Sequence, residues 1–131
     1  GSEMCIRDRI ELLGVQSSFD EMSEVEKIVE NTIEIAPDLT GIFVVSGGQA
    51  GVCKAMQKLN METRPYVIGY DVTPTNIKAL KEGTYDFLID QEGFEQGYRP
   101  PHLLYNMIRK GEKIEKEYAY TDISIKTKYN L

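Results

Sequence analysis

Short apolar runs alternate with longer amphipathic stretches along the chain. Residues 10–15, 41–45, 66–70 and 86–89 are short, mostly apolar runs, which predicts four strands. Residues 41–45 carry no polar side chain, so this strand is expected to be buried on both faces, as in a parallel sheet. Residues 118–127 alternate in part between polar and apolar side chains and predict a further strand at a sheet edge.

The stretches between these runs have helical spacing. Apolar side chains recur at three- and four-residue steps through residues 21–35, which predicts an amphipathic helix. Shorter helices are expected over residues 49–59 and 74–81. Thr73 suits the N-cap of the second of these helices and Pro74 suits its first position, because proline needs no hydrogen-bond partner there.

A last helix is predicted over residues 94–109, where Pro100 and Pro101 should kink or delay it and Gly111 should end it. Strands and helices therefore alternate with short connections. This order favours the α/β class, with three layers, a mainly parallel sheet of four to five strands and helices on both faces. A length of 131 residues suits one such domain.

Composition and charge disfavour several classes of function. The chain has 15 basic and 21 acidic residues and a net charge of −6, which disfavours non-specific binding of nucleic acid. No apolar run approaches the ~20 residues of a membrane span, and we expect no signal peptide in this sequence. Two cysteines and one histidine do not make a disulfide framework or a zinc site. We therefore expect no metal and no cofactor.

The first nine residues stand apart from this pattern. Gly1-Ser2 looks like a cloning remnant, and residues 4–9 resemble a translated sequencing adapter, a contaminant of open reading frames from assembled reads. We expect residues 1–9 to be an artefact and residues 10–131 to form the single α/β domain, with a gene cut at its 5′ end. The alternative is that residues 1–9 are a short native tail.

Candidate binding groups follow the predicted strands. Ligands bind at the carboxyl ends of the strands in such sheets. A carboxylate accepts two hydroxyl hydrogen bonds, an amide donates and accepts, and a ring covers the apolar face of a sugar. The set suits a neutral, polyhydroxylated ligand better than a reaction, because the sequence has no nucleophile beside a histidine, and we expect no enzyme. The candidates are Phe19, Ser46, Gly47, Asp71 and Gln91.

Each candidate has a second interpretation. Asp71 precedes Thr-Pro and also suits a residue that shapes a turn. Gln91 fits an ordinary strand-end position, and Phe19 fits a hydrophobic staple for the helix that follows it. Residues 46–48 could bind an anion on their amides, although they lack the lysine of a phosphate-binding loop.

Four motifs together resemble the type I periplasmic binding protein superfamily. They are DLTGIFVVSG at residues 38–47, VIGYDVTP at 67–74, LIDQ at 88–91 and QGY at 96–98. Each motif alone is weak, but their order and spacing are specific, and the resemblance covers residues 10–131. The superfamily includes sugar-binding proteins of transporters and effector domains of Lac-repressor-type transcription regulators.

The resemblance implies a role for each candidate. Asp71 matches the aspartate that binds sugar hydroxyls in members of the superfamily. Gln91 matches a glutamine that ends a strand at the hinge between their two lobes. Phe19 looks like the aromatic residue that flanks the sugar. Ser46 and Gly47 stand where many members carry Asn-Asp, and this departure leaves the specificity at that position open.

Residues 123–128 resemble the tails of the regulator branch. This resemblance predicts a lobe of a cytoplasmic transcription regulator that senses a small ligand, a sugar, and that makes no contact with nucleic acid through this part of the protein. One alternative is a periplasmic or extracellular sugar-binding protein of a transporter. The other alternative is a folded remnant without ligand activity, and in every case binding by this chain alone is expected to be weak.

The resemblance covers most of the C-terminal lobe of a two-lobed protein, without that lobe's first strand and helix. The predicted helix over residues 94–109 would then lack the partner for its apolar side chains (Leu103, Leu104, Met107 and Ile108). We expect residues 10–15 to close up to 41–45 and this helix to fold back onto the sheet, giving a flavodoxin-like unit. Alternatively, two copies form a homodimer by exchanging elements.

Overall fold

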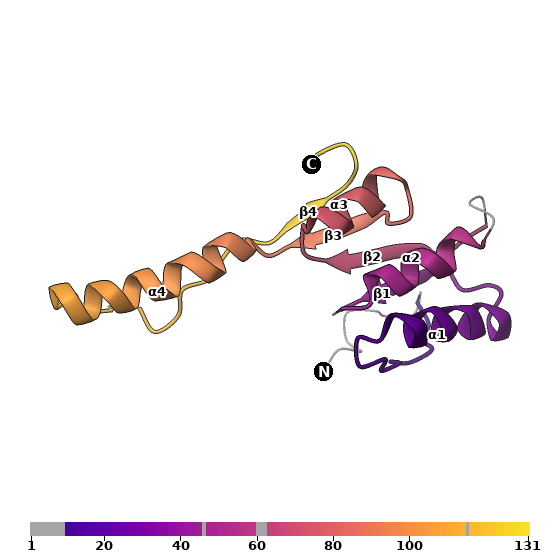
Figure 1. Ribbon diagram of the computed structural model, residues 1–131, viewed down its shortest axis with the longest axis horizontal. Coiled ribbons are helices and arrows are strands. Elements are labelled where there is room, and N and C mark those ends of the chain that lie inside the picture. Colours follow the sequence, from indigo (N-terminus) through magenta and orange to yellow (C-terminus); the bar gives the residue numbers. More distant parts are fainter. Residues whose placement is uncertain (1–9, 46, 60–62, 115) are drawn as a thin grey trace.

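The computed structural model describes residues 10–45, 47–59, 63–114 and 116–131. Residues 1–9, which we expect to be an artefact, and the candidate binding residue Ser46 lie outside the described residues. Helices and strands alternate (Figure 1). In chain order they are α1 (Met22–Ile35), β1 (Gly41–Val44), α2 (Gln49–Gln57), β2 (Tyr66–Tyr70), α3 (Pro74–Lys81), β3 (Phe87–Asp90), α4 (Gly93–Lys110) and β4 (Ser124–Lys126). The predicted α/β class with a flavodoxin-like arrangement is confirmed.

The sheet has four strands in the order β1-β2-β3-β4. The first three strands are parallel, and β4 pairs antiparallel with β3 at the edge. The edge strand expected over residues 118–127 is therefore present, in the shorter form of β4. A parallel register places Tyr70 of β2 beside Ile89 of β3, so these two strands end at nearly the same level.

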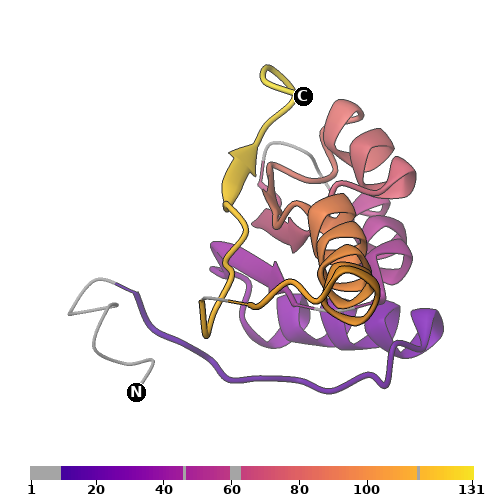
Figure 2. The same ribbon diagram turned by 90° about the vertical axis from the view of Figure 1, so that its left-hand side faces the viewer.

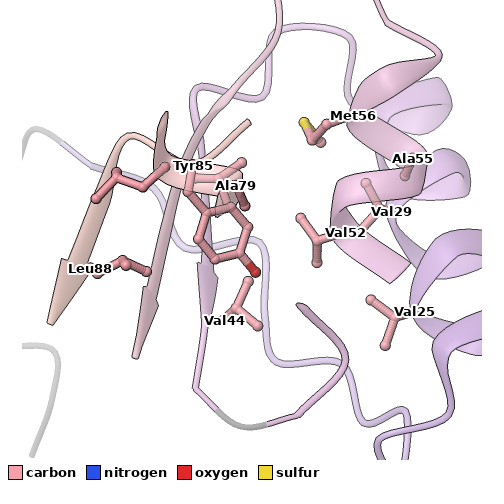
Figure 3. Packing of buried hydrophobic residues seen from close by; sticks show 11 residues of the cluster. Val25, Val29, Val44, Val52, Ala55, Met56, Ala79, Tyr85 and Leu88 are labelled. Atoms are coloured by element: carbon pink, nitrogen blue, oxygen red, sulfur yellow. The ribbon is translucent and has the colours of Figure 1, made fainter. Parts of the chain in front are cut away.

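One hydrophobic core lies between the sheet and three helices. Helices α1, α2 and α3 all contribute to this core, which means that they cover the same face of the sheet (Figure 3). Gly51 of α2 lets the first two helices approach, because an added Cβ would collide with the carbonyl oxygen of Met22. The fully buried side chains of the core include Val52, Met56, Val67, Leu80, Tyr85 and Leu88.

Local signals place α3 as predicted. The hydroxyl oxygen of Thr73 accepts a hydrogen bond from the backbone N–H of Asn76 at 3.2 Å, and Pro74 occupies the first helical position. The cap satisfies an N–H group that has no partner inside the helix. In α4, Pro100 and Pro101 lie inside a helix that begins at Gly93, so they do not delay its start.

Two expected features differ in the structure. Residues 10–15 form no strand, and their apolar side chains are exposed, so this segment does not close up to β1. A strand needs a neighbour that pairs with its backbone groups, and the apolar pattern does not supply one. The expectation that β1 is buried on both faces is also wrong, because Phe43 is 52% exposed.

Helix α4 does not fold back onto the sheet. It leaves the carboxyl end of β3 and projects away from the body of the molecule (Figure 1), and Figure 2 shows it nearly end-on. Only Asn106 of its residues is buried. As a result, the described helices leave one face of the sheet uncovered, which differs from the expected helices on both faces. Within the described ranges, no helix combines the length and apolar character that crossing a membrane requires.

Candidate ligand-binding site

The candidate site lies at the carboxyl edge of the sheet. Because β1, β2 and β3 run parallel, the loops that follow them meet at this edge. Gly47 follows β1, Asp71 follows β2, and Gln91 follows β3. Gly47 and Asp71 are exposed and Gln91 is half-buried, so the edge forms an open shelf with polar groups on it.

Asp71 and Gln91 contact each other. The Gln91 side-chain amide (Nε2) donates a hydrogen bond to Oδ1 of Asp71 at 3.3 Å. The backbone N–H of Asp71 donates to the carbonyl oxygen of Ile89 at 2.9 Å, which continues the β2–β3 ladder by one residue. Asp71 has a φ of 67°, a left-handed conformation that aspartate tolerates better than most residues. The carboxylate is thus fixed at the end of the sheet and open to solvent.

The main chain of Gln91 is held by the segment that returns from α4. Its carbonyl oxygen accepts hydrogen bonds from Nε2 of Gln96 at 2.8 Å and from the hydroxyl of Thr121 at 3.1 Å. Nε2 of Gln96 also lies 3.3 Å from the Thr121 hydroxyl oxygen. The main chain that carries the Gln91 side chain is therefore bonded both to α4 and to the segment that returns from it.

Asn76 supports the site and was not among the predicted residues. Its side-chain amide, which is 1% exposed, donates to the carbonyl oxygens of Tyr70 and Asp71, both at 2.9 Å. These bonds stabilise the turn that carries the Asp71 carboxylate. One sequence signal could have found this residue: Asn76 has helical spacing with the buried Ala79 and Leu80, and a polar side chain on a buried face needs partners.

The loop with Phe19 lies beside Gly47. A Cβ added to Gly47 would lie within 3.0 Å of the Asp20 side chain, so the two loops are in contact. Phe19 itself is 91% exposed, with a φ of 50°. This exposure contradicts the interpretation of Phe19 as a hydrophobic staple and leaves its ring accessible. Gly47 is therefore next to the Phe19 loop, and Asp71 is next to Gln91.

This arrangement offers hydrogen-bonding groups and one exposed ring. In the part of the chain that the structure describes, no three His, Cys, Asp or Glu side chains gather as metal ligands do. A separate hollow of about 420 Å³ lies at the opposite edge of the sheet, lined in part by Thr40, Arg64, Tyr66 and Asp86. The carboxyl edge is therefore suited to holding hydroxyl groups by hydrogen bonds.

Comparison with known proteins identifies the family of the chain. The family model described as "Periplasmic binding protein domain" matches residues 5–113. The chain belongs to this family. A curated relative, the xylose/arabinose-binding protein XylF of Sulfolobus acidocaldarius, is 29% identical over 90 residues, which cover 64% of this chain and 22% of that protein.

Solved structures of solute-binding proteins have the same fold. Two proteins from Agrobacterium vitis, one with bound D-fucose and one with α-D-tagatopyranose, both give a TM-score of 0.84, at 22% and 24% identity. Each comparison covers 98% of this chain, and 44% and 43% of the respective solved chains. The chain therefore spans less than half the length of these solved structures and about a fifth of the curated relative.

Proposed function

We propose that this chain is a sugar-binding lobe of a transporter's solute-binding protein and acts outside the cytoplasm. The observation that carries the proposal is the Asp71–Gln91 hydrogen bond at the carboxyl edge of the sheet. The relatives support the same function, because the curated one is named for binding xylose and arabinose and two solved ones hold sugars.

The residues account for binding without a reaction. The Asp71 carboxylate accepts hydrogen bonds from two neighbouring sugar hydroxyls. The Gln91 amide, which already donates to Asp71, offers its oxygen to a further hydroxyl. The exposed ring of Phe19 covers an apolar sugar face, and the absence of a side chain at Gly47 leaves room for the Asp20 side chain beside it. None of these steps moves a proton to or from a reacting atom, so the lobe is a binding module and not an enzyme.

The transporter interpretation replaces the regulator as the favoured one. The expectation of a cytoplasmic, Lac-repressor-type effector rested on residues 123–128, part of which forms the edge strand β4. The relatives are sugar-binding proteins by name, and the solved ones include transporter components. The regulator interpretation remains a prediction that none of these names favours.

Binding by this chain alone should be weak. The site is an open shelf, and a ligand on it keeps most of its surface in water, whereas tight sites bury ~70–90% of a small ligand. A dissociation constant in the millimolar range corresponds to about 4 kcal/mol, which a few exposed hydrogen bonds can supply.

The test is an NMR titration with isotope-labelled protein and a panel of pentoses and hexoses up to ~50 mM, above the expected dissociation constant. We expect saturable shifts of the Gln91 side-chain amide and of the backbone amide of Asp71. Asp71→Asn should weaken binding about tenfold or more, because the charged acceptor contributes ~1.5–3 kcal/mol. Asp38→Asn, an exposed aspartate beside the opposite edge of the sheet, is the matched control and should bind as the parent chain does. No shift across the panel, or equal binding by Asp71→Asn, would refute the proposal.

A further inference from the structure

Among the described residues, no helix lies over one face of the sheet. Strand side chains alternate between faces, and Val44, Val67 and Leu88 point into the helical core. The residues next to these along each strand point to the opposite face of the sheet. We call this surface the uncovered face, and its side chains are Phe43, Tyr66, Ile68, Tyr70, Phe87, Ile89 and Ile125.

The uncovered face is apolar over all four strands. Every side chain in it is aliphatic or aromatic, and Phe43 stacks at an angle on Tyr70 with ring centroids 5.5 Å apart. Tyr66 and Ile125 are each 62% exposed. Parallel sheets of α/β proteins have both faces covered, so a surface of this composition needs a second layer.

Helix α4, which projects away from the sheet (Figure 1), carries an apolar stripe. Five of its apolar side chains recur at helical spacing and are 51–79% exposed. The opposite side of the helix faces the returning chain, where Arg99 donates to the carbonyl oxygen of Tyr120 at 3.3 Å. The stripe therefore faces outward while the helix projects from the body (Figure 1). We define the α4 stripe as Phe94, Tyr98, Leu104, Tyr105 and Ile108.

We propose that the α4 stripe of one copy lies on the uncovered face of a second copy, and that the second copy returns the same contact. Each chain has an apolar face that lacks a helix and a helix that lacks an apolar partner. In a dimer with a two-fold axis, the α4 stripe of each copy covers the uncovered face of the other, and the assembly is closed. Each sheet then has helices on both faces, which completes the three layers.

The dimensions and areas fit this contact. An 18-residue helix is ~27 Å long, and four strands are ~19 Å wide, so one helix spans the sheet. The six aromatic rings Phe43, Tyr66, Phe87, Phe94, Tyr98 and Tyr105 retain about 700 Å² of exposed surface per copy, taking ~200 Å² for a whole ring. A standard stable interface removes about 800 Å² from each partner, and the aliphatic side chains supply the remainder.

Charge also favours this arrangement. Neither the uncovered face nor the α4 stripe contains a charged residue, so the contact buries no unpaired ion. The chain as a whole carries −6, so two copies repel each other on average, and a contact made of uncharged side chains adds no further like-charge pair.

The test uses neighbouring leucines on α4. Leu104 lies in the stripe, whereas Leu103 lies about 100° round the helix, toward the returning chain. Light scattering with size-exclusion chromatography should show a dimer for the parent chain. Leu104→Glu and Phe43→Glu should each raise the dimer dissociation constant about a hundredfold, because each substitution disrupts both symmetric contacts. Leu103→Glu, the matched control, should stay within about threefold of the parent chain. Far-UV circular dichroism checks that each variant is folded.

A mixing experiment distinguishes this dimer from other ways of covering the uncovered face. In a mixture of Leu104→Glu and Phe43→Glu, one of the two contacts pairs an unaltered α4 with an unaltered sheet. Heterodimers should therefore form from two variants that are each monomeric. Absence of heterodimers would overturn the proposal, and so would a parent chain that is monomeric at every concentration. Loss of dimer in Phe43→Glu with retention in Leu104→Glu would instead assign the interface to two sheets packed face to face.

Discussion

Asn76 should contribute more to stability than any other polar side chain near the candidate site. Asn76→Ala removes two 2.9 Å hydrogen bonds to the carbonyl oxygens of Tyr70 and Asp71. Each bond is worth about 1 kcal/mol, and a carbonyl left buried without a partner costs a further 1–3 kcal/mol. Water can replace the bond at exposed Asp71 but less readily at half-buried Tyr70. We therefore expect the free energy of unfolding to fall by about 2–3 kcal/mol.

Urea unfolding followed by circular dichroism measures this loss. With a slope of about 1.5 kcal/mol per molar urea, the midpoint should fall by about 1.3–2 M. Asn31→Ala is the matched control, because Asn31 is exposed in the middle of α1 and should change stability by less than about 0.5 kcal/mol. A midpoint shift of Asn76→Ala no larger than that of Asn31→Ala would show that the turn does not depend on these bonds.

Two further predictions concern buried polar groups. The Tyr85 hydroxyl is buried with no hydrogen-bond partner among the described residues, so Tyr85→Phe should stabilise the fold by about 1 kcal/mol. Burial, and secondarily the nearby Cys53, raises the pKa of Tyr85 above its ordinary value of about 10. The parent chain should therefore lose stability as the pH rises above about 10, and urea midpoints should show a smaller loss for Tyr85→Phe. The Arg64 side chain, which is 9% exposed, donates hydrogen bonds to both carboxylate oxygens of Asp86 at 2.9 and 3.0 Å. Arg64→Lys should therefore lower the Tm by about 5–10 °C, because lysine does not make this paired contact. An unchanged Tm would show that the Arg64–Asp86 ion pair does not stabilise the fold.

The elements that depend on local signals could be predicted. Helix α3 is an example, because the Thr73 cap and Pro74 at the first position act within four residues of each other. The apolar runs of β1, β2 and β3 could also be found, since any buried strand needs them. These features need no knowledge of where distant parts of the chain lie.

The features that depend on a distant partner could not be predicted. Residues 10–15 have the composition of a strand but no neighbour that pairs with them. The helical spacing of α4 predicts a helix correctly, yet it does not say which surface the apolar side chains of that helix contact. The same limit applies to Asn76, whose two acceptors belong to the turn before α3 and become partners only when that turn is formed.

The Asp71–Gln91 contact depends both on local sequence and on the pairing of distant strands. The sequence places an aspartate and a glutamine after two apolar strands, but only the register brings them together. Tyr70 is paired with Ile89, so Asp71 and Gln91 follow at nearly the same level. A slip of one residue would turn the side chains of β3 to the opposite face and separate the pair. Gln91 also lies two residues before the first residue of α4, so any surface that fixes α4 also restrains the main chain that carries the Gln91 amide.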